Sequence, residues 1–183
     1  MRPVVGLRSI GFGLILVGAV MGSVAAAPES KVISLGAMSI SIAWDAGWQL
    51  ADSAANAPPN SAYFQAAKRS DMVVLLAGDM APSDAGIDET MRSMVDDNAK
   101  EFLGTSVQKS LPVEAFKNGA THGYEVCATD RAPKPDEWKY VCKGMAAMGD
   151  LVVGYTLLYN DSGRKQAERA EKALRAMQIS RGV

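Results

Sequence analysis

Both cysteines of this 183-residue chain lie in one short stretch, YEVCATDRAPKPDEWKYVC. The residues around Cys127 and Cys142 are typical of strands, and the segment DRAPKPDE between them has the proline, aspartate and charge content of a loop. We therefore expect an antiparallel hairpin whose strands are joined by a Cys127–Cys142 disulfide. This pairing sets the register of the two strands. As a result, Val126 lies opposite Lys143, a charged residue on an otherwise apolar face.

Three roles are open for the cysteine pair: a structural disulfide, a reactive or switching pair, and half of a metal site. Fourteen residues separate the two cysteines, whereas a redox pair favours the spacing Cys-x-x-Cys at a helix N-terminus. A metal site needs three or four ligands, and the chain has a single histidine, His122, and no second cysteine pair. We expect a structural disulfide worth about 3 kcal/mol, and neither a metal nor a cofactor.

The beginning of the chain has the pattern of a signal peptide. Arg2 and Arg8 precede an apolar run from Ile10 to Val20, and the small residues GSVAAAP follow. The run is too short to span a membrane, and cleavage after Ala26 leaves residues 27–183, the size of a single domain. We expect a periplasmic or secreted protein with no membrane segment after cleavage. Such a compartment is oxidising, which favours the disulfide.

The spacing of apolar residues predicts two helices. Residues 87–103 carry an apolar stripe with the spacing i, i+4, i+7, i+8. Ser83 or Asp84 is placed to cap the start of this helix, and Gly104 to end it in a left-handed conformation. Residues 163–177 form the second helix, capped by Asp161 or Ser162. Its inner stripe consists of Ala167, Ala170, Leu174 and Met177.

The remaining periodic segments read as strands. Residues 38–44 alternate between apolar and polar side chains, residues 62–69 and 71–80 form a strand pair, and residues 151–159 are apolar on both faces, as in a central strand. This order predicts the α+β class: an antiparallel sheet with long helices packed on it.

Several of these segments together resemble the PsbP-like fold, an α/β/α sandwich found in an extrinsic photosystem subunit and in small periplasmic proteins of the DcrB type. The segments are WDAGWQL, AYFQAAKR, DMVVLLAGDM, the helix over 87–103, the hairpin and the closing ALRAMQI. The resemblance covers nearly all of residues 27–183 as an order of elements. It implies a non-enzymatic binding or assembly module.

The charge balance and the absence of catalytic motifs narrow the functional classes. The formal net charge is −1 with both signs interspersed, which argues against a nucleic-acid partner. The sequence contains no nucleophile elbow, metalloprotease helix, phosphate loop or nucleotide fingerprint. His122 is the only ordinary general base near neutral pH, and a lone histidine beside a turn more often has a structural role. We therefore do not expect an enzyme.

Two functional hypotheses follow. In the first, the hairpin loop binds an envelope or secretion protein. Its candidate contact residues are Arg131, Lys134, Asp136, Glu137 and Trp138. In the second, a small molecule, with or without an enzymatic reaction, binds between the sheet and the helix over 87–103. The candidate lining residues of this pocket are His122, Tyr124 and Tyr155. The sequence leaves the oligomeric state open.

Overall fold

The computed structural model describes residues 29–44, 48–51, 60–66, 72–78 and 86–182. The expected signal peptide and the expected turn at Ser70 and Asp71 lie outside these residues. No helix in the described part of the chain is long and apolar enough to cross a membrane.

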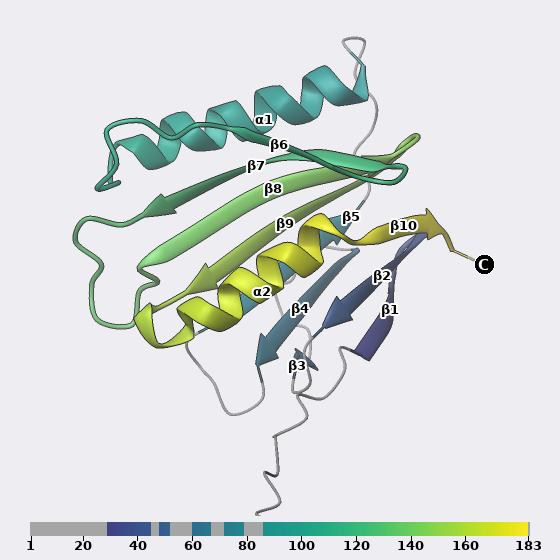
Figure 1. The fold of residues 1–183 in the computed structure, drawn as a ribbon, viewed down its shortest axis with the longest axis horizontal. Helices are drawn as coiled ribbons and strands as arrows, with labels where there is room; N and C mark the ends of the chain where they lie inside the picture. Colours follow the sequence, from purple (N-terminus) through teal and green to yellow (C-terminus); the bar gives the residue numbers. More distant parts are fainter. Residues whose placement is uncertain (1–28, 45–47, 52–59, 67–71, 79–85, 183) are drawn as a thin grey trace, which may run out of the picture.

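The described strands form two antiparallel sheets (Figure 1). The smaller sheet has three strands in the order β1 (Glu29–Leu35), β2 (Met38–Trp44), β10 (Gln178–Arg181). The larger sheet has seven, in the order β3 (Trp48–Ala51), β4 (Ser61–Ala66), β5 (Met72–Gly78), β9 (Leu151–Tyr159), β8 (Tyr140–Met148), β7 (Thr121–Thr129), β6 (Glu114–Asn118). The predicted single sheet is therefore two sheets. As expected, β9 lies in the centre of the larger one.

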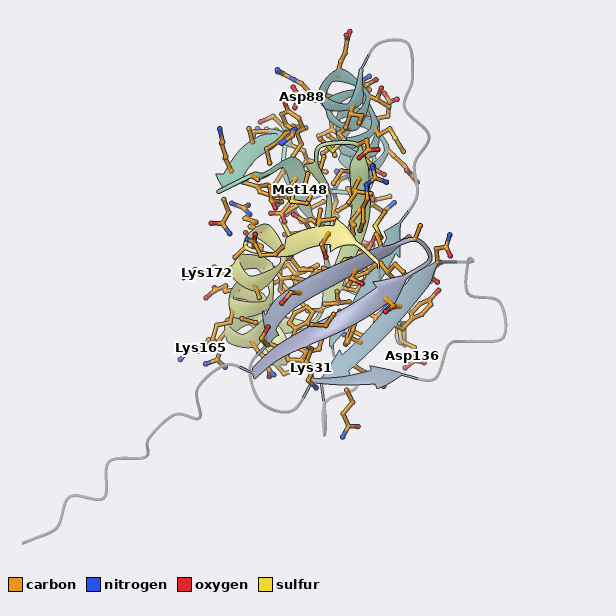
Figure 2. The ribbon with its side chains drawn as sticks, turned by 90° about the vertical axis from the view of Figure 1, so that its right-hand side faces the viewer. Lys31, Asp88, Asp136, Met148, Lys165 and Lys172 are labelled. Carbon is orange, nitrogen blue, oxygen red and sulfur yellow. A yellow bond between two sulfur atoms is a disulfide. The ribbon has the colours of Figure 1, made fainter. Side chains whose placement is uncertain are left out.

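The larger sheet is covered on both faces. Helix α1 (Ile87–Leu103) packs on β7 and β8 through Met91, Val95 and Ala99. Helix α2 (Arg164–Arg175) and the smaller sheet cover the opposite face, and Figure 2 shows these two elements beside each other. The main core forms under them. It includes Trp44, Trp48, Phe64, Val74, Leu157, Leu174, Met177 and Ile179.

Helix α1 has the predicted bounds, but its ends differ from the expectation. Gly86 occupies the N-cap position, and no side chain among the described residues caps the helix. Ser83 and Asp84 lie outside those residues. Gly104 has φ −62° and is right-handed. The helix instead ends in a tight turn, because the amides of Thr105 and Ser106 both donate to the Phe102 carbonyl.

Helix α2 is 12 residues long, shorter than predicted, and follows a 3-10 turn at Asp161–Gly163. The Asp161 carboxylate does not cap it, because it accepts hydrogen bonds from Lys139 Nζ at 2.7 Å and Tyr140 Oη at 2.6 Å instead. The chain leaves the helix after Arg175 to form β10. The four residues of the predicted inner stripe are buried, as expected.

The hairpin formed by β7 and β8 has the predicted register, with Cys127 opposite Cys142 and Val126 opposite Lys143. Lys143 is accommodated on the α1 side because its Nζ lies 5.0 Å from the centroid of the Phe102 ring and donates to Asn98 Oδ1 at 3.2 Å. The aliphatic stem of the lysine thus covers the sheet while its charge reaches polar partners.

Candidate functional site

The disulfide joins the two strands of the hairpin, β7 and β8, near the sheet surface that faces α2. The sulfurs of Cys127 and Cys142 are bonded, as the sequence predicted. Cys127 is exposed, whereas Cys142 is 1% exposed and belongs to the main core. The Cys127 residue is therefore more accessible to solvent than Cys142.

Glu125 shares the sheet face of Cys127, because residues two apart on a strand point the same way. It is 1% exposed, which for a carboxylate requires hydrogen-bonding partners. Tyr155 Oη donates to its Oε2 at 2.6 Å. Arg175 donates to its Oε1 from Nη2 at 2.5 Å and from Nε at 3.2 Å. The buried charge is thus paired with a phenol from β9 and a guanidinium from α2.

Two further carboxylates contact the same guanidinium. Arg175 Nη2 lies 3.0 Å from Glu114 Oε2 and 2.9 Å from Glu171 Oε1. We call Glu114, Glu125, Tyr155, Glu171 and Arg175 the Glu125 cluster. With all its carboxyl groups ionised, the cluster would carry three negative charges against a single positive one.

Burial and the excess of negative charge raise the pKa values of two groups in the cluster, the Glu171 carboxyl and the Tyr155 phenol. Burial, together with the charge of Glu125, raises the pKa of the Glu171 carboxyl to about 7. Burial also raises the pKa of the Tyr155 phenol well above its usual value, and the Glu125 charge adds to this. Tyr155 therefore remains a hydrogen-bond donor, and Glu171 binds a proton near neutral pH.

Two glycines make this packing possible. A Cβ atom at Gly144 would overlap the ring of Tyr155, which crosses the β8 backbone to reach Glu125. A Cβ atom at Gly123 would overlap the ring of Phe116, and this ring lies 5.9 Å below the Arg175 guanidinium. Only glycine leaves room for these close approaches of ring and backbone.

A hollow of about 270 Å³ opens at the cluster. Its lining residues are Pro112, Glu114, Glu125, Cys127, Glu171 and Arg175. Ligand-type atoms of Glu125, Cys127, Cys142 and Glu171 all lie within 4.8 Å of one another. The disulfide bonds the two sulfurs to each other, so that the oxidised protein offers carboxylates here but no thiolate ligands.

The hairpin loop, residues 130–139, begins three residues after Cys127 and ends before β8. Six of its residues are exposed: Arg131, Ala132, Lys134, Pro135, Asp136 and Glu137. Backbone hydrogen bonds join Asp130 N to Lys139 O at 2.8 Å and Glu137 N to Lys134 O at 3.1 Å. The Glu137 carboxylate accepts from Lys134 N at 3.0 Å, and Asp136 adopts the left-handed φ of 69°. The loop is thus exposed and internally hydrogen-bonded.

The base of the loop is fixed to two other segments. Arg131 donates from its backbone N to Thr105 O at 2.9 Å and from Nη2 to Ser106 O at 2.7 Å. At the other end, Lys139 N donates to Asn160 Oδ1 at 3.0 Å. Trp138, the loop's aromatic residue, is half-buried. Two exposed apolar side chains, Leu103 and Val107, flank the anchoring segment.

The residues predicted for a pocket are divided between the two faces of the sheet. His122 Nε2 lies 3.4 Å from Asp88 Oδ1, and Tyr124 Oη donates to Asp88 Oδ2 at 2.9 Å, so these two residues meet at the start of α1. The Tyr155 side chain points to the opposite face, toward Glu125. A hollow of about 230 Å³ does border α1. Tyr155 is among its lining residues, whereas His122 and Tyr124 are not.

Sequence reasoning missed the Glu125 cluster. Two signals pointed to it: Glu125 occupies the same strand face as Cys127, and Glu171 and Arg175 are four residues apart on a helix. Neither signal predicts that α2 lies where Arg175 reaches Glu125 on β7.

Comparison with known proteins gives the fold. No family model matches the sequence, and no curated protein matches it. The chain is similar to the solution structure of cyanobacterial PsbP (CyanoP) from Synechocystis sp. PCC 6803, with a TM-score of 0.54 and 11% identity over 90% of this chain and 99% of that chain. It also aligns with LpqN, a protein involved in cell envelope biogenesis of Mycobacterium tuberculosis, with a TM-score of 0.48 and 12% identity over 83% of this chain and 91% of that chain. The likeness to CyanoP confirms the PsbP-like fold and says nothing about activity.

Proposed function

We propose that this protein is an exported, non-enzymatic accessory module that binds another protein of the cell envelope or secretion machinery through the hairpin loop. The observation that carries the proposal is the combination of exposure and order in residues 130–139. A loop that is already ordered loses little conformational entropy when a partner binds, which favours affinity. Its prolines and the Lys134–Glu137 pair contribute to that order.

The surroundings of the loop add apolar contact area. Val107 is 54% exposed and its backbone N donates to Thr129 O, directly before the loop. Leu103 is 40% exposed at the end of α1. Exposed apolar residues beside ordered polar groups are typical of a protein-binding surface with an apolar centre and a polar rim. Export is supported by the signal-peptide pattern at the start of the chain.

The test is chemical crosslinking of the envelope in the host, followed by purification through a C-terminal tag. One variant replaces Arg131 to Glu137 with a glycine and serine linker of equal length. The matched control replaces Lys165 and Lys172 with alanine, since these side chains point outward from α2 (Figure 2). We expect a stoichiometric partner with the unmodified protein and the control, and its loss with the loop variant. Equal recovery with all three proteins would contradict the proposal.

A second candidate function is small-molecule binding in the hollow beside α1. The specific observation is that Met94 is 44% exposed there, next to Asn98, Lys143 and the small residues Ala77 and Gly154. A flexible methionine beside polar groups can adapt to a ligand. A ligand screen by thermal shift, with Met94→Ala as the binding-deficient variant, tests this candidate. A shift that is equal in both proteins would place the ligand elsewhere.

A further inference from the structure

We propose that the Cys127–Cys142 disulfide is a thiol–disulfide exchange site, in which a thiolate of a second molecule attacks the Cys127 sulfur and the Glu125–Glu171 carboxyl pair protonates the departing Cys142 sulfur. This activity does not depend on the loop proposal, because it uses the disulfide and the Glu125 cluster on the sheet face toward α2 and none of the loop residues 130–139. Its chemistry requires an accessible sulfur, a stabilised leaving group and a thiol reactant.

The difference in burial selects the attacked sulfur. Cys127 is partly exposed and lines the hollow at the Glu125 cluster, whereas Cys142 is 1% exposed and does not line it. An incoming thiolate therefore reaches Cys127 and forms the new sulfur–sulfur bond there. The electron pair of the old bond leaves with Cys142.

The departing sulfur needs a proton. A thiolate in the buried position of Cys142 would be poorly solvated, and the neighbouring carboxylates would repel it. The carboxyl groups of Glu125 and Glu171 lie within 4.8 Å of both sulfurs, within reach through one water molecule. Because the pKa of Glu171 is raised to about 7, this residue carries a transferable proton near neutral pH.

Groups from four elements face the disulfide at this point and determine its response to pH. They are Glu114 on β6, Glu125 on β7, Tyr155 on β9, and Glu171 and Arg175 on α2. Tyr155 stays protonated and Arg175 stays charged, since its hydrogen bonds and charge pairing with these carboxylates outweigh burial and raise its pKa. Glu171 is therefore the group whose titration near pH 7 changes the supply of protons.

The complete reaction consumes a dithiol or two monothiols. The first thiolate forms a mixed disulfide with Cys127, and Cys142 becomes a thiol by taking the carboxyl proton. A second thiolate then attacks the sulfur of the bound reactant and releases Cys127, which takes a proton from water. Two electrons pass to the protein and the reactant is oxidised to its disulfide.

The first experiment measures the rate at which dithiothreitol reduces the disulfide of the folded protein. Free thiols are alkylated at successive times and counted from the intact mass of the protein. An exchange site is reduced faster than the protein unfolds, at a rate that is insensitive to urea concentrations below the unfolding transition. A structural disulfide that opens only on unfolding is reduced at the unfolding rate. That second result would overturn the proposal.

The second experiment tests whether the Glu125–Glu171 carboxyl pair donates the proton. Rates are divided by the concentration of reductant thiolate, which makes simple exchange independent of pH. With Glu171 as proton donor, the normalised rate should fall about tenfold per pH unit above pH 7. It should be flat in Glu171→Gln, while Glu168→Gln, an exposed control on α2, should behave as the unmodified protein. A flat profile in the unmodified protein would overturn the role of the carboxyl pair.

The third experiment distinguishes a small thiol from a protein thiol. In Cys142→Ser, Cys127 is a free thiol. When its thiolate attacks the disulfide form of the reactant, a mixed disulfide forms at Cys127 and one reactant thiol is released, and no second cysteine of the chain reverses this step. A glutathione adduct on the exported variant would identify a small thiol, and a protein adduct a protein thiol. In the unmodified protein, brief treatment with glutathione should modify Cys127. Modification of Cys142 first, or no adduct at either position, would contradict the proposed geometry.

Discussion

Glu125 depends on residues from three other elements for its burial. Tyr155 reaches it across Gly144, Arg175 reaches it from α2, and Glu114 and Glu171 compete for the same guanidinium. Removal of one partner of a buried ion pair is costly because the remaining charge is left without compensation. Single substitutions in this cluster should therefore have larger effects than substitutions of exposed residues on the same helix.

Glu171 should make the stability of the protein depend on pH. Its pKa is about 7 in the folded protein and near 4.5 when unfolded, so the folded state binds the proton more tightly. The resulting stabilisation is complete below pH 4.5 and is lost as the pH rises through 7. Relative to that of Glu171→Gln, the free energy of unfolding of the unmodified protein should fall by about 2 kcal/mol between pH 4.5 and pH 8. This value allows for the partial solvent exposure of Glu171. Urea unfolding of both proteins at the two pH values measures this, and a constant difference would contradict it.

Gly144 and Gly154 provide a matched pair of substitutions in neighbouring strands. A Cβ atom at Gly144 overlaps the Tyr155 ring, whereas at Gly154 the nearest atom, the Ala77 carbonyl oxygen, is 3.9 Å away. Gly144→Ala must displace the ring and weaken its hydrogen bond to Glu125, at a cost of about 2 kcal/mol. Gly154→Ala should change the free energy of unfolding by less than about 0.5 kcal/mol. Similar effects in urea unfolding would show that the ring is not held as described.

At the scale of elements, local periodicity predicts most of the secondary structure. The apolar stripe of α1 and the paired cysteines gave correct helix bounds and a correct register, because both signals lie within one element or one hairpin. The short β10 carries only a weak local pattern. It pairs with β2 at the other end of the chain, a contact that no local signal encodes, and the second sheet was therefore missed.

Only part of the candidate site was predicted, because the sequence patterns report contacts within one element or one hairpin. The disulfide and the loop belong to a single hairpin and could be read from adjacent residues. The Arg175–Glu125 contact spans 50 residues and depends on how α2 crosses the sheet. His122 and Tyr155 were both predicted to line a pocket between the sheet and α1, and the structure places their side chains on opposite faces.

The disulfide should stabilise the hairpin and the domain together. Cys127→Ala combined with Cys142→Ala should lower the free energy of unfolding by about 3 kcal/mol, because the unfolded chain regains the freedom of the closed loop. Urea unfolding under non-reducing conditions measures this. A loss below about 1 kcal/mol would indicate that the surrounding contacts hold the hairpin without the bond.

At the scale of the whole molecule, the fold separates the loop from the C-terminus. Figure 1 shows the loop between β7 and β8 at one end of the larger sheet and the end of the chain beyond β10 at the other. A tag at the C-terminus therefore leaves the loop free. The exposed face of α2 carries Lys165 and Lys172 and offers a control surface on the same molecule.

The most direct measurement of the proposed function is site-specific photocrosslinking in the host. A photoreactive amino acid replaces Lys134 or Asp136 in the loop, or Lys172 on α2, and each product is purified through the C-terminal tag. The account predicts one crosslinked protein from both loop positions and none from position 172. Crosslinks from position 172 to that protein, or none from the loop, would contradict the assignment of the loop as the binding surface.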